Sequence, residues 1–234
     1  FHLDEAIRDG RPAGLIEHGN WATVYEGLAQ LPEQVRRSWF AFDHYYSDGV
    51  FRQLLPIVFE SHPRRILDVG GNTGKWARLC CRHDPEVTVT IADLPGQLSE
   101  AMAAAEADGL GARIHAHACD LLDPRSTLPA VYDVIWMSQF LDCFSEEEIV
   151  AILRRAAAAM TPSTALYILE TFWDLQRHEA ARFSVVQTSL YFAVVANGNS
   201  KMYHSERMLE CIEKAGLRVE TTIPDLGVSH TLLC

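Results

Sequence analysis

Ile66-Leu67-Asp68-Val69-Gly70-Gly71-Asn72-Thr73-Gly74 is the stretch that decides the fold of this 234-residue chain. A short apolar run leads directly into glycines, and apolar residues follow at helical spacing through Trp76, Leu79 and Cys80. Strand, glycine loop and helix, in that order, allow the backbone to approach a ligand closely. The stretch does not have GxGxxG spacing, and it is not a P-loop, because Trp76 stands where Ser or Thr would bind a metal.

A first strand is predicted over residues 65–69, directly before the glycine loop. After the loop, helices and strands alternate along the chain. Further strands are predicted over 87–92, 112–118, 132–137 and 165–169, and helices over 98–107, 145–160, 175–195 and 205–215. Ser145 and Glu148 predict a capping box at the start of one of these helices. Two last strands, over 217–223 and 230–233, have only a turn between them. The pattern predicts a doubly wound, mostly parallel seven-stranded sheet with an antiparallel hairpin at its edge.

The first 62 residues have a different texture, with apolar and aromatic residues at helical spacing and no strand pattern. A helix that Pro32 opens is predicted through Trp39 and Phe42, and a separate one through Val50 and Val58. The sequence therefore predicts a helical segment over residues 1–62 and a larger ligand-binding domain over residues 63–234.

Composition argues against several classes of function. The net charge is −11 and no block of consecutive basic residues occurs, which disfavours a nucleic-acid or membrane-surface partner. No apolar run approaches the roughly 18 residues that span a bilayer. The six cysteines form no CxxC pair, so we expect no zinc site and reduced thiols in a cytoplasmic protein.

Three acids lie at the carboxyl ends of successive predicted strands: Asp68, Asp93 and Asp120. Asp68, two residues before Gly70, suits a cationic ligand such as the amino-acid portion of S-adenosylmethionine. Asp93 can accept both ribose hydroxyls, as in dinucleotide enzymes, and Asp120 can accept from the adenine amine. Ligands of open α/β sheets bind at this edge, so the three acids predict an S-adenosylmethionine site. A nicotinamide dehydrogenase is the alternative, disfavoured by Asp68 and by the antiparallel edge.

These residues, with Asp93-Leu94-Pro95, Cys119-Asp120-Leu121 and Phe144-Ser145-Glu146-Glu147, resemble the plant caffeate-type and bacterial antibiotic-type O-methyltransferases over nearly the whole chain. The resemblance implies a Rossmann-like class I methyltransferase fold and a role in secondary metabolism. It also implies a homodimer formed through a further N-terminal domain, because residues 3–12 are similar to the segment after that domain. The expected cofactor-binding residues are Asp68, Gly70, Gly71, Thr73, Gly74, Asp93, Leu94, Asp120, Leu121 and Ser138, the last where plant enzymes often carry a lysine.

The general base of that family is a histidine in a His-Asp-Trp-Ser stretch, and here the matching residues are Asp142-Cys143-Phe144-Ser145. Asp142 is therefore the candidate base, or else a loop acid or helix cap, and its apolar neighbours can raise its pKa. Glu170 is the second catalytic candidate, because it follows a strand end that should face the cleft, and it matches the acid that flanks the base in plant enzymes. The other flanking acid falls near Met202 and is missing. We expect His44, Tyr45, Phe172 and His204 to line the acceptor pocket, with a helix-capping role as the alternative for His204.

The sequence thus predicts methyl transfer from S-adenosylmethionine to a small molecule, at a phenolic or polyketide-like hydroxyl. Aromatic side chains could stack on such an acceptor: Trp21, Tyr25, Trp39, Phe40, Tyr45, Phe172 and Trp173. Transfer to carbon or nitrogen stays open because the usual histidine is absent. A cofactor-binding domain without transferase activity, in a regulatory or assembly role, is a further alternative.

Overall fold

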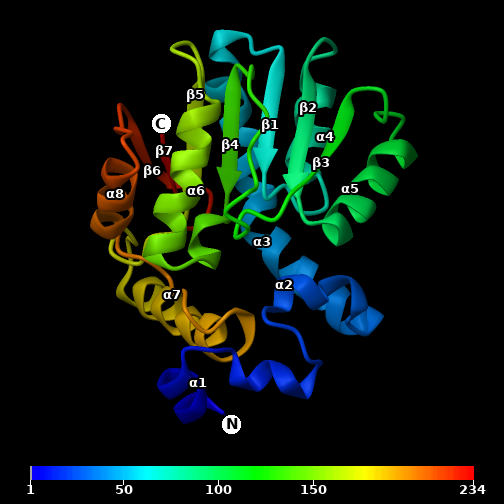
Figure 1. The fold of residues 1–234 in the computed structure, drawn as a ribbon. Helices are drawn as coiled ribbons and strands as arrows, with labels where there is room; N and C mark the ends of the chain where they lie inside the picture. The colour runs from blue at the N-terminus through cyan, green and yellow to red at the C-terminus, as the bar shows by residue number, and fades with distance from the viewer. Residues whose placement is uncertain (1) are drawn as a thin grey trace.

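The computed structural model describes residues 2–234, apart from the side chains of residues 43, 46 and 48. A single sheet with strand order β3-β2-β1-β4-β5-β7-β6 forms its centre (Figure 1). The strands are β1 Arg65–Val69, β2 Thr88–Asp93, β3 Ile114–Ala118, β4 Val134–Ser138, β5 Ala165–Glu170, β6 Thr222–Leu226 and β7 His230–Leu233. The pairs among β1 to β5 are parallel, whereas β7 runs antiparallel to β5 and β6. The predicted fold class is confirmed.

Helices cover both faces of the sheet and one of its edges. They are α1 Leu3–Asp9, α2 Val24–Gly27, α3 Glu33–Val58, α4 Lys75–His83, α5 Pro95–Ala107, α6 Glu146–Ala159, α7 Glu179–Tyr191 and α8 Ser205–Lys214. Short helical turns add η1 Ala13–Glu17, η2 Leu28–Gln30, η3 Phe59–Ser61, η4 Leu141–Cys143 and the π-helical η5 Phe192–Ala196. In Figure 1, α6 and α8 lie in front of the sheet and α3 and α4 lie behind it.

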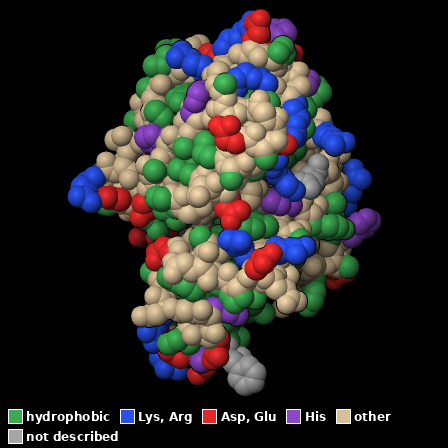
Figure 2. Space-filling view, turned by 90° about the vertical axis from the view of Figure 1, so that its right-hand side faces the viewer, with side chains coloured by type: hydrophobic (Ala, Val, Ile, Leu, Met, Phe, Trp, Pro, Cys, Tyr) green, Lys and Arg blue, Asp and Glu red, His purple; other side chains and the backbone are tan. Residues whose placement is uncertain are grey.

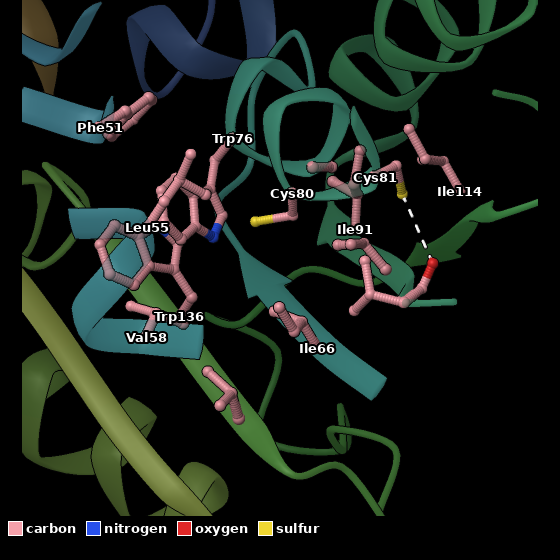
Figure 3. Close-up of a cluster of buried hydrophobic side chains, with 14 of the residues drawn as sticks. Phe51, Leu55, Val58, Ile66, Trp76, Cys80, Cys81, Ile91, Ile114 and Trp136 are labelled. Carbon is pink, nitrogen blue, oxygen red and sulfur yellow. Dashed lines mark hydrogen bonds between the residues drawn. The ribbon is translucent and has the colours of Figure 1, made fainter. Parts of the chain in front are cut away.

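The two faces follow from the two-residue repeat of a strand, which sends neighbouring side chains to opposite sides. In β1, Ile66 packs into the core with α3, α4 and α5, and Leu67 packs into the core with α6 and α8. Trp76 of α4 stacks on Trp136 of β4 in the first core, with ring centroids 4.1 Å apart (Figure 3). Cys81 donates its thiol to the carbonyl of Val87 nearby.

A separate helical cap, made of α1, η1, α2, the start of α3, α7 and η5, lies below the carboxyl ends of β1 and β4 (Figure 1). It has a core of its own, formed by Leu15, Val24, Leu28, Leu31, Phe192, Ala196 and Met202. Its chain segments come from both ends of the sequence, since α1 and η1 pack on η5. The cap therefore closes the sheet edge at which ligands of α/β proteins bind.

Two predicted helix boundaries were wrong. The helices expected through Phe42 and from Val50 are one 26-residue helix, α3, because a lone Gly49 costs only about 1 kcal/mol inside a helix. The helix expected from residue 175 begins at Glu179. The buried amide of Gln176 donates to the carbonyls of Phe172 (2.7 Å) and Ser229 (3.0 Å), which holds the preceding residues in a loop.

The last strand, β7, has the predicted bounds, but its partner β6 lies later in the sequence than the predicted 217–223 and includes Pro224. Proline is tolerated there because β6 is the edge strand and its pairing with β7 shifts register between Ile223 and Leu226. The capping box at Ser145 is confirmed: its hydroxyl accepts from the Glu148 amide, and the Glu148 carboxylate accepts from the Ser145 amide.

Acidic and basic side chains are interspersed on the face shown in Figure 2, without a continuous basic surface there. Within residues 2–234, no helix has both the length and the apolar character needed to cross a membrane. All six cysteines are free thiols, and no cluster of metal-ligating side chains occurs among the residues described.

Candidate active site

A cavity of about 990 Å³ lies between the carboxyl ends of the strands and the helical cap. The loops after β1, β2 and β3 and the part of α3 from His44 onward line one end of it. The other end is lined by α2, the start of α3, the loop after β4 with η4, the start of α6, α7 and η5. A volume of this size can hold a cofactor and a small acceptor side by side. We call the first part the strand end and the second part the acceptor end.

The glycine loop after β1 forms the floor of the strand end. Gly70 has φ +70°, and a Cβ there would lie 2.1 Å from a ring carbon of Phe140, so only glycine fits this position. The Gly70 amide donates to the carbonyl of Ala92 at 2.9 Å, which ties the loop to β2. Gly74, also with positive φ, precedes α4 as its N-cap. The loop therefore exposes backbone to the cavity next to a helix N-terminus.

Asp68 is a buried carboxyl at this floor, 2% exposed, and it lines the cavity. Its Oδ2 has no hydrogen-bond partner among the described residues. Burial and the nearby charge of Asp93 raise its pKa to about 8. An unpaired buried carboxyl is costly, and a cationic ligand in the cavity would compensate it.

Asp93, at the end of β2, accepts hydrogen bonds from the backbone amides of Asn72 (2.9 Å) and Leu94 (2.7 Å). Burial raises its pKa to about 6, although both amides favour the ionised form. Asp93 thus links the glycine loop to β2 and still lines the cavity. Asp120, after β3, is exposed and accepts from the Leu122 amide at 2.8 Å.

Two carboxyl groups are linked to the loop after β4: Asp142 belongs to this loop, and Glu170 of β5 accepts hydrogen bonds from it. Asp142 of η4 lines the cavity, and burial raises its pKa to about 6. Glu170, at the end of β5, is 1% exposed, and its Oε1 accepts from the amides of Phe140 (3.0 Å) and Leu141 (2.8 Å). Burial, and then the charge of Asp142, raise the pKa of Glu170 well above its usual range. Glu170 holds the loop that presents Asp142 and does not itself line the cavity.

The structure brings most of the expected site residues to the cavity: His44, Asp68, Gly70, Gly71, Asp93, Leu94, Asp120, Leu121, Ser138 and Asp142. His44 of α3 also lies 3.1 Å from the hydroxyl of Thr73, measured from its Nε2. Thr73 and Gly74 are not among the lining residues. Both belong to the glycine loop: Gly74 is the N-cap of α4, and the hydroxyl of Thr73 contacts His44.

The predicted pocket role was wrong for three aromatic or imidazole side chains. Tyr45 is 71% exposed on α3, and Phe172 is 1% exposed inside the sheet core. His204 caps α8, where its Nδ1 accepts from the Glu206 amide at 3.1 Å. Helical spacing showed that these residues lie on helices or strand ends, but it does not show which way each one faces.

Three residues that line the acceptor end were not expected from the sequence: Tyr191, Asn197 and Gln139. Trp39, by contrast, was among the aromatic residues expected to contact the acceptor. Trp39 donates from Nε1 to the hydroxyl of Tyr191 at 2.7 Å, across 152 residues of sequence. Asn197 donates to the carbonyl of Cys143 at 2.6 Å and so fastens the end of η5 to η4. Gln139 also lines the cavity; it has φ +47°, and its Oε1 is buried without a hydrogen-bond partner among the described residues. No local sequence pattern predicts such long-range contacts. In the structure, the π-helical turn η5 and the positive φ of Gln139 are features that often occur at functional sites.

The comparisons with known proteins agree with this geometry. A model of the O-methyltransferase domain family matches residues 1–218. The chain is 30% identical to 3-hydroxy-5-methyl-1-naphthoate 3-O-methyltransferase of Streptomyces sahachiroi, over 73% of this chain and 47% of the relative. It is also 30% identical to aclacinomycin 10-hydroxylase RdmB of Streptomyces purpurascens, over 77% of this chain and 46% of that relative. The chain thus spans about half the length of these two curated relatives.

Among solved structures, the fold is similar to NcsB1, an O-methyltransferase from neocarzinostatin biosynthesis in complex with S-adenosylmethionine and 2-hydroxy-5-methyl naphthoic acid. The TM-score is 0.79 with 21% identity, over 99% of this chain and 66% of that one, so this likeness concerns the fold. The match to the family model covers nearly all of the sequence, and on that basis the chain belongs to the O-methyltransferase domain family.

Proposed function

We propose that this chain transfers a methyl group from S-adenosylmethionine to a hydroxyl of an aromatic small molecule. The observation that carries the proposal is the buried Asp68, whose Oδ2 is unpartnered beside the backbone of Gly70 and Gly71. That carboxyl is suited to the amino group of the cofactor, Asp93 to the ribose, and Asp120 with Leu121 to the adenine. The match to the O-methyltransferase domain family and the naphthoate O-methyltransferase named above support the same activity.

The cofactor supplies an activated methyl group when it is bound. The chain then has to align the acceptor oxygen, keep water away and take up a proton. Alignment alone can supply much of the rate of such a reaction. Aromatic walls at the acceptor end, among them Tyr25, Trp39 and Phe144, exclude water from the reacting groups.

Asp142 is the side chain proposed to accept the proton of the acceptor hydroxyl. A carboxylate of ordinary pKa, near 4, is a weak base, but burial brings the pKa of Asp142 to about 6. That value lies close to the ordinary imidazole pKa of about 6.5, so Asp142 approaches the basicity of the histidine it replaces. Glu170 positions Asp142 through the two amides that it accepts from.

The test is single-turnover methyl transfer to a panel of phenols. The product is identified by mass, which distinguishes methylation from hydroxylation, because one relative carries the name of a hydroxylase. We expect Asp142→Asn to slow transfer by about 10²–10⁴-fold without weakening S-adenosylhomocysteine binding. The wild-type rate should rise with pH through about 6 as Asp142 ionises. Asp142→His should restore part of the rate. An unchanged rate in Asp142→Asn would show that this residue is not the base.

A further inference from the structure

The acceptor end is lined by carboxylates and aromatic rings. The charges of these side chains indicate which charge the acceptor molecule should carry. The acidic, histidine and lysine side chains that line the whole cavity are Glu26, His44, Asp68, Lys75, Asp93, Asp120, Asp142 and Glu148. His44 and Lys75 both belong to the strand end, because His44 contacts Thr73 and Lys75 directly follows Gly74. The acceptor end is left with Glu26, Asp142 and Glu148.

These three carboxylates have no cationic partner within the described part of the chain. Glu148 is held by the amide (2.8 Å) and hydroxyl (2.9 Å) of Ser145, and Glu26 accepts weakly from the Ala22 amide at 3.4 Å. Neither of these contacts brings a positive side chain. Glu170 does not line the cavity, but it holds the loop that carries Asp142, and its Oε2 has no partner in residues 2–234.

The remaining walls suit the same kind of ligand. Five aromatic side chains line the acceptor end: Tyr25, Trp39, Phe144, Tyr191 and Phe192. Aromatic faces attract cations, and carboxylates accept from ammonium groups. A carboxylate on the ligand, by contrast, would meet like charge in a partly desolvated site, where repulsion is stronger than in water.

We propose that the acceptor is an aromatic molecule bearing a basic amine, and that the acceptor end discriminates against aryl carboxylic acids. This inference rests on the proposed function, since it concerns the second substrate of the same site. The amine lies toward Glu26 and Glu148 at the outer part of the acceptor end, and the hydroxyl to be methylated faces Asp142.

The test uses one hydroxynaphthalene scaffold that carries an aminomethyl, a carboxamide or a carboxylate group. Each compound is titrated calorimetrically into the chain saturated with S-adenosylhomocysteine, whose own binding is measured first. We expect the amine to bind at least tenfold more tightly than the carboxylate, with the uncharged amide between them. The preference for the amine should weaken as salt is raised, because exposed charge pairs are screened.

A matched pair of variants assigns the effect to the cavity. Glu148→Gln keeps a side chain that can complete the capping box but removes the charge, and Glu147→Gln removes an exposed charge next to it that does not line the cavity. We expect the ratio of amine to amide affinity to fall at least threefold in Glu148→Gln and to stay unchanged in Glu147→Gln. Equal or tighter binding of the carboxylate, or binding of none of the three compounds, overturns the inference. Failure of S-adenosylhomocysteine to bind would instead refute the proposed function.

Discussion

The pKa of Asp68 makes cofactor binding dependent on pH in a way that can be calculated. With a pKa of about 8, the carboxyl is ionised in about 1% of molecules at pH 6 and about 9% at pH 7. A cofactor ammonium that pairs with the ionised form therefore binds about tenfold more tightly at pH 7 than at pH 6. Binding at pH 7 should also release close to one proton, because most molecules must ionise Asp68 to make the pair.

The assay is calorimetric titration with S-adenosylhomocysteine, in two buffers of different ionisation enthalpy so that released protons are counted. 5′-Methylthioadenosine is the matched ligand, because it has the same nucleoside without the amino-acid portion. Its affinity reports any titration of Asp93, whose pKa is about 6, so the difference between the ligands isolates Asp68. The Asp68→Asn variant should bind S-adenosylhomocysteine at least tenfold more weakly at pH 8 and lose the difference in pH dependence.

The same pH dependence for both ligands, with no proton released, would refute this assignment of Asp68. Weak binding of both ligands to Asp68→Asn would have a different meaning. It would show that the substitution disturbs the glycine loop itself. In that case a measurement of the fold that involves no ligand, such as the circular dichroism spectrum, should also differ from wild type.

Three further predictions concern stability and the loop. In urea denaturation, ligand-free Asp68→Asn should be more stable than wild type by a few kcal/mol at pH 8 but not at pH 4. The reason is that the folded-state pKa of Asp68 is raised to about 8, so the wild-type free energy of unfolding falls as pH rises from 4 to 8. Gly70→Ala should cost about 1–3 kcal/mol and weaken S-adenosylhomocysteine at least tenfold, since its Cβ would meet the Phe140 ring 2.1 Å away and its φ is +70°; wild-type affinity would contradict the close approach. Asp93→Ala should abolish cofactor binding with the fold intact, and the same titration with unchanged affinity would remove Asp93 from the site.

Local patterns in the sequence were enough to predict the sheet. The glycine loop that begins at Gly70 has a strand before it and a helix after it. That strand, β1, has the predicted bounds, Arg65–Val69. The capping box at Ser145 was predictable because both partners lie within one helical turn. Parallel strands place their carboxyl ends at one edge, so the convergence of Asp68, Asp93 and Asp120 on one cavity also followed from topology.

The acceptor end could not be predicted in the same way, because distant parts of the chain form it. The hydrogen bond of Trp39 to Tyr191 joins residues 152 apart, and Asn197 reaches Cys143 across 54 residues. Tyr45 and His44 are neighbours on α3, yet one is 71% exposed and the other faces the cavity. The direction in which a side chain points along a long helix depends on what packs beside it, and the sequence of the helix does not contain that information.

The cap has a core that is distinct from the two cores of the sheet. A change to Leu28 or Phe192 therefore alters the shape of the acceptor end, while the glycine loop keeps its tie to β2 through Gly70 and Ala92. This division makes the molecule modular for evolution and for engineering. New acceptor preferences can be selected by varying the cap alone, and libraries confined to it should retain cofactor binding in a larger share of their members than libraries spread over the whole chain.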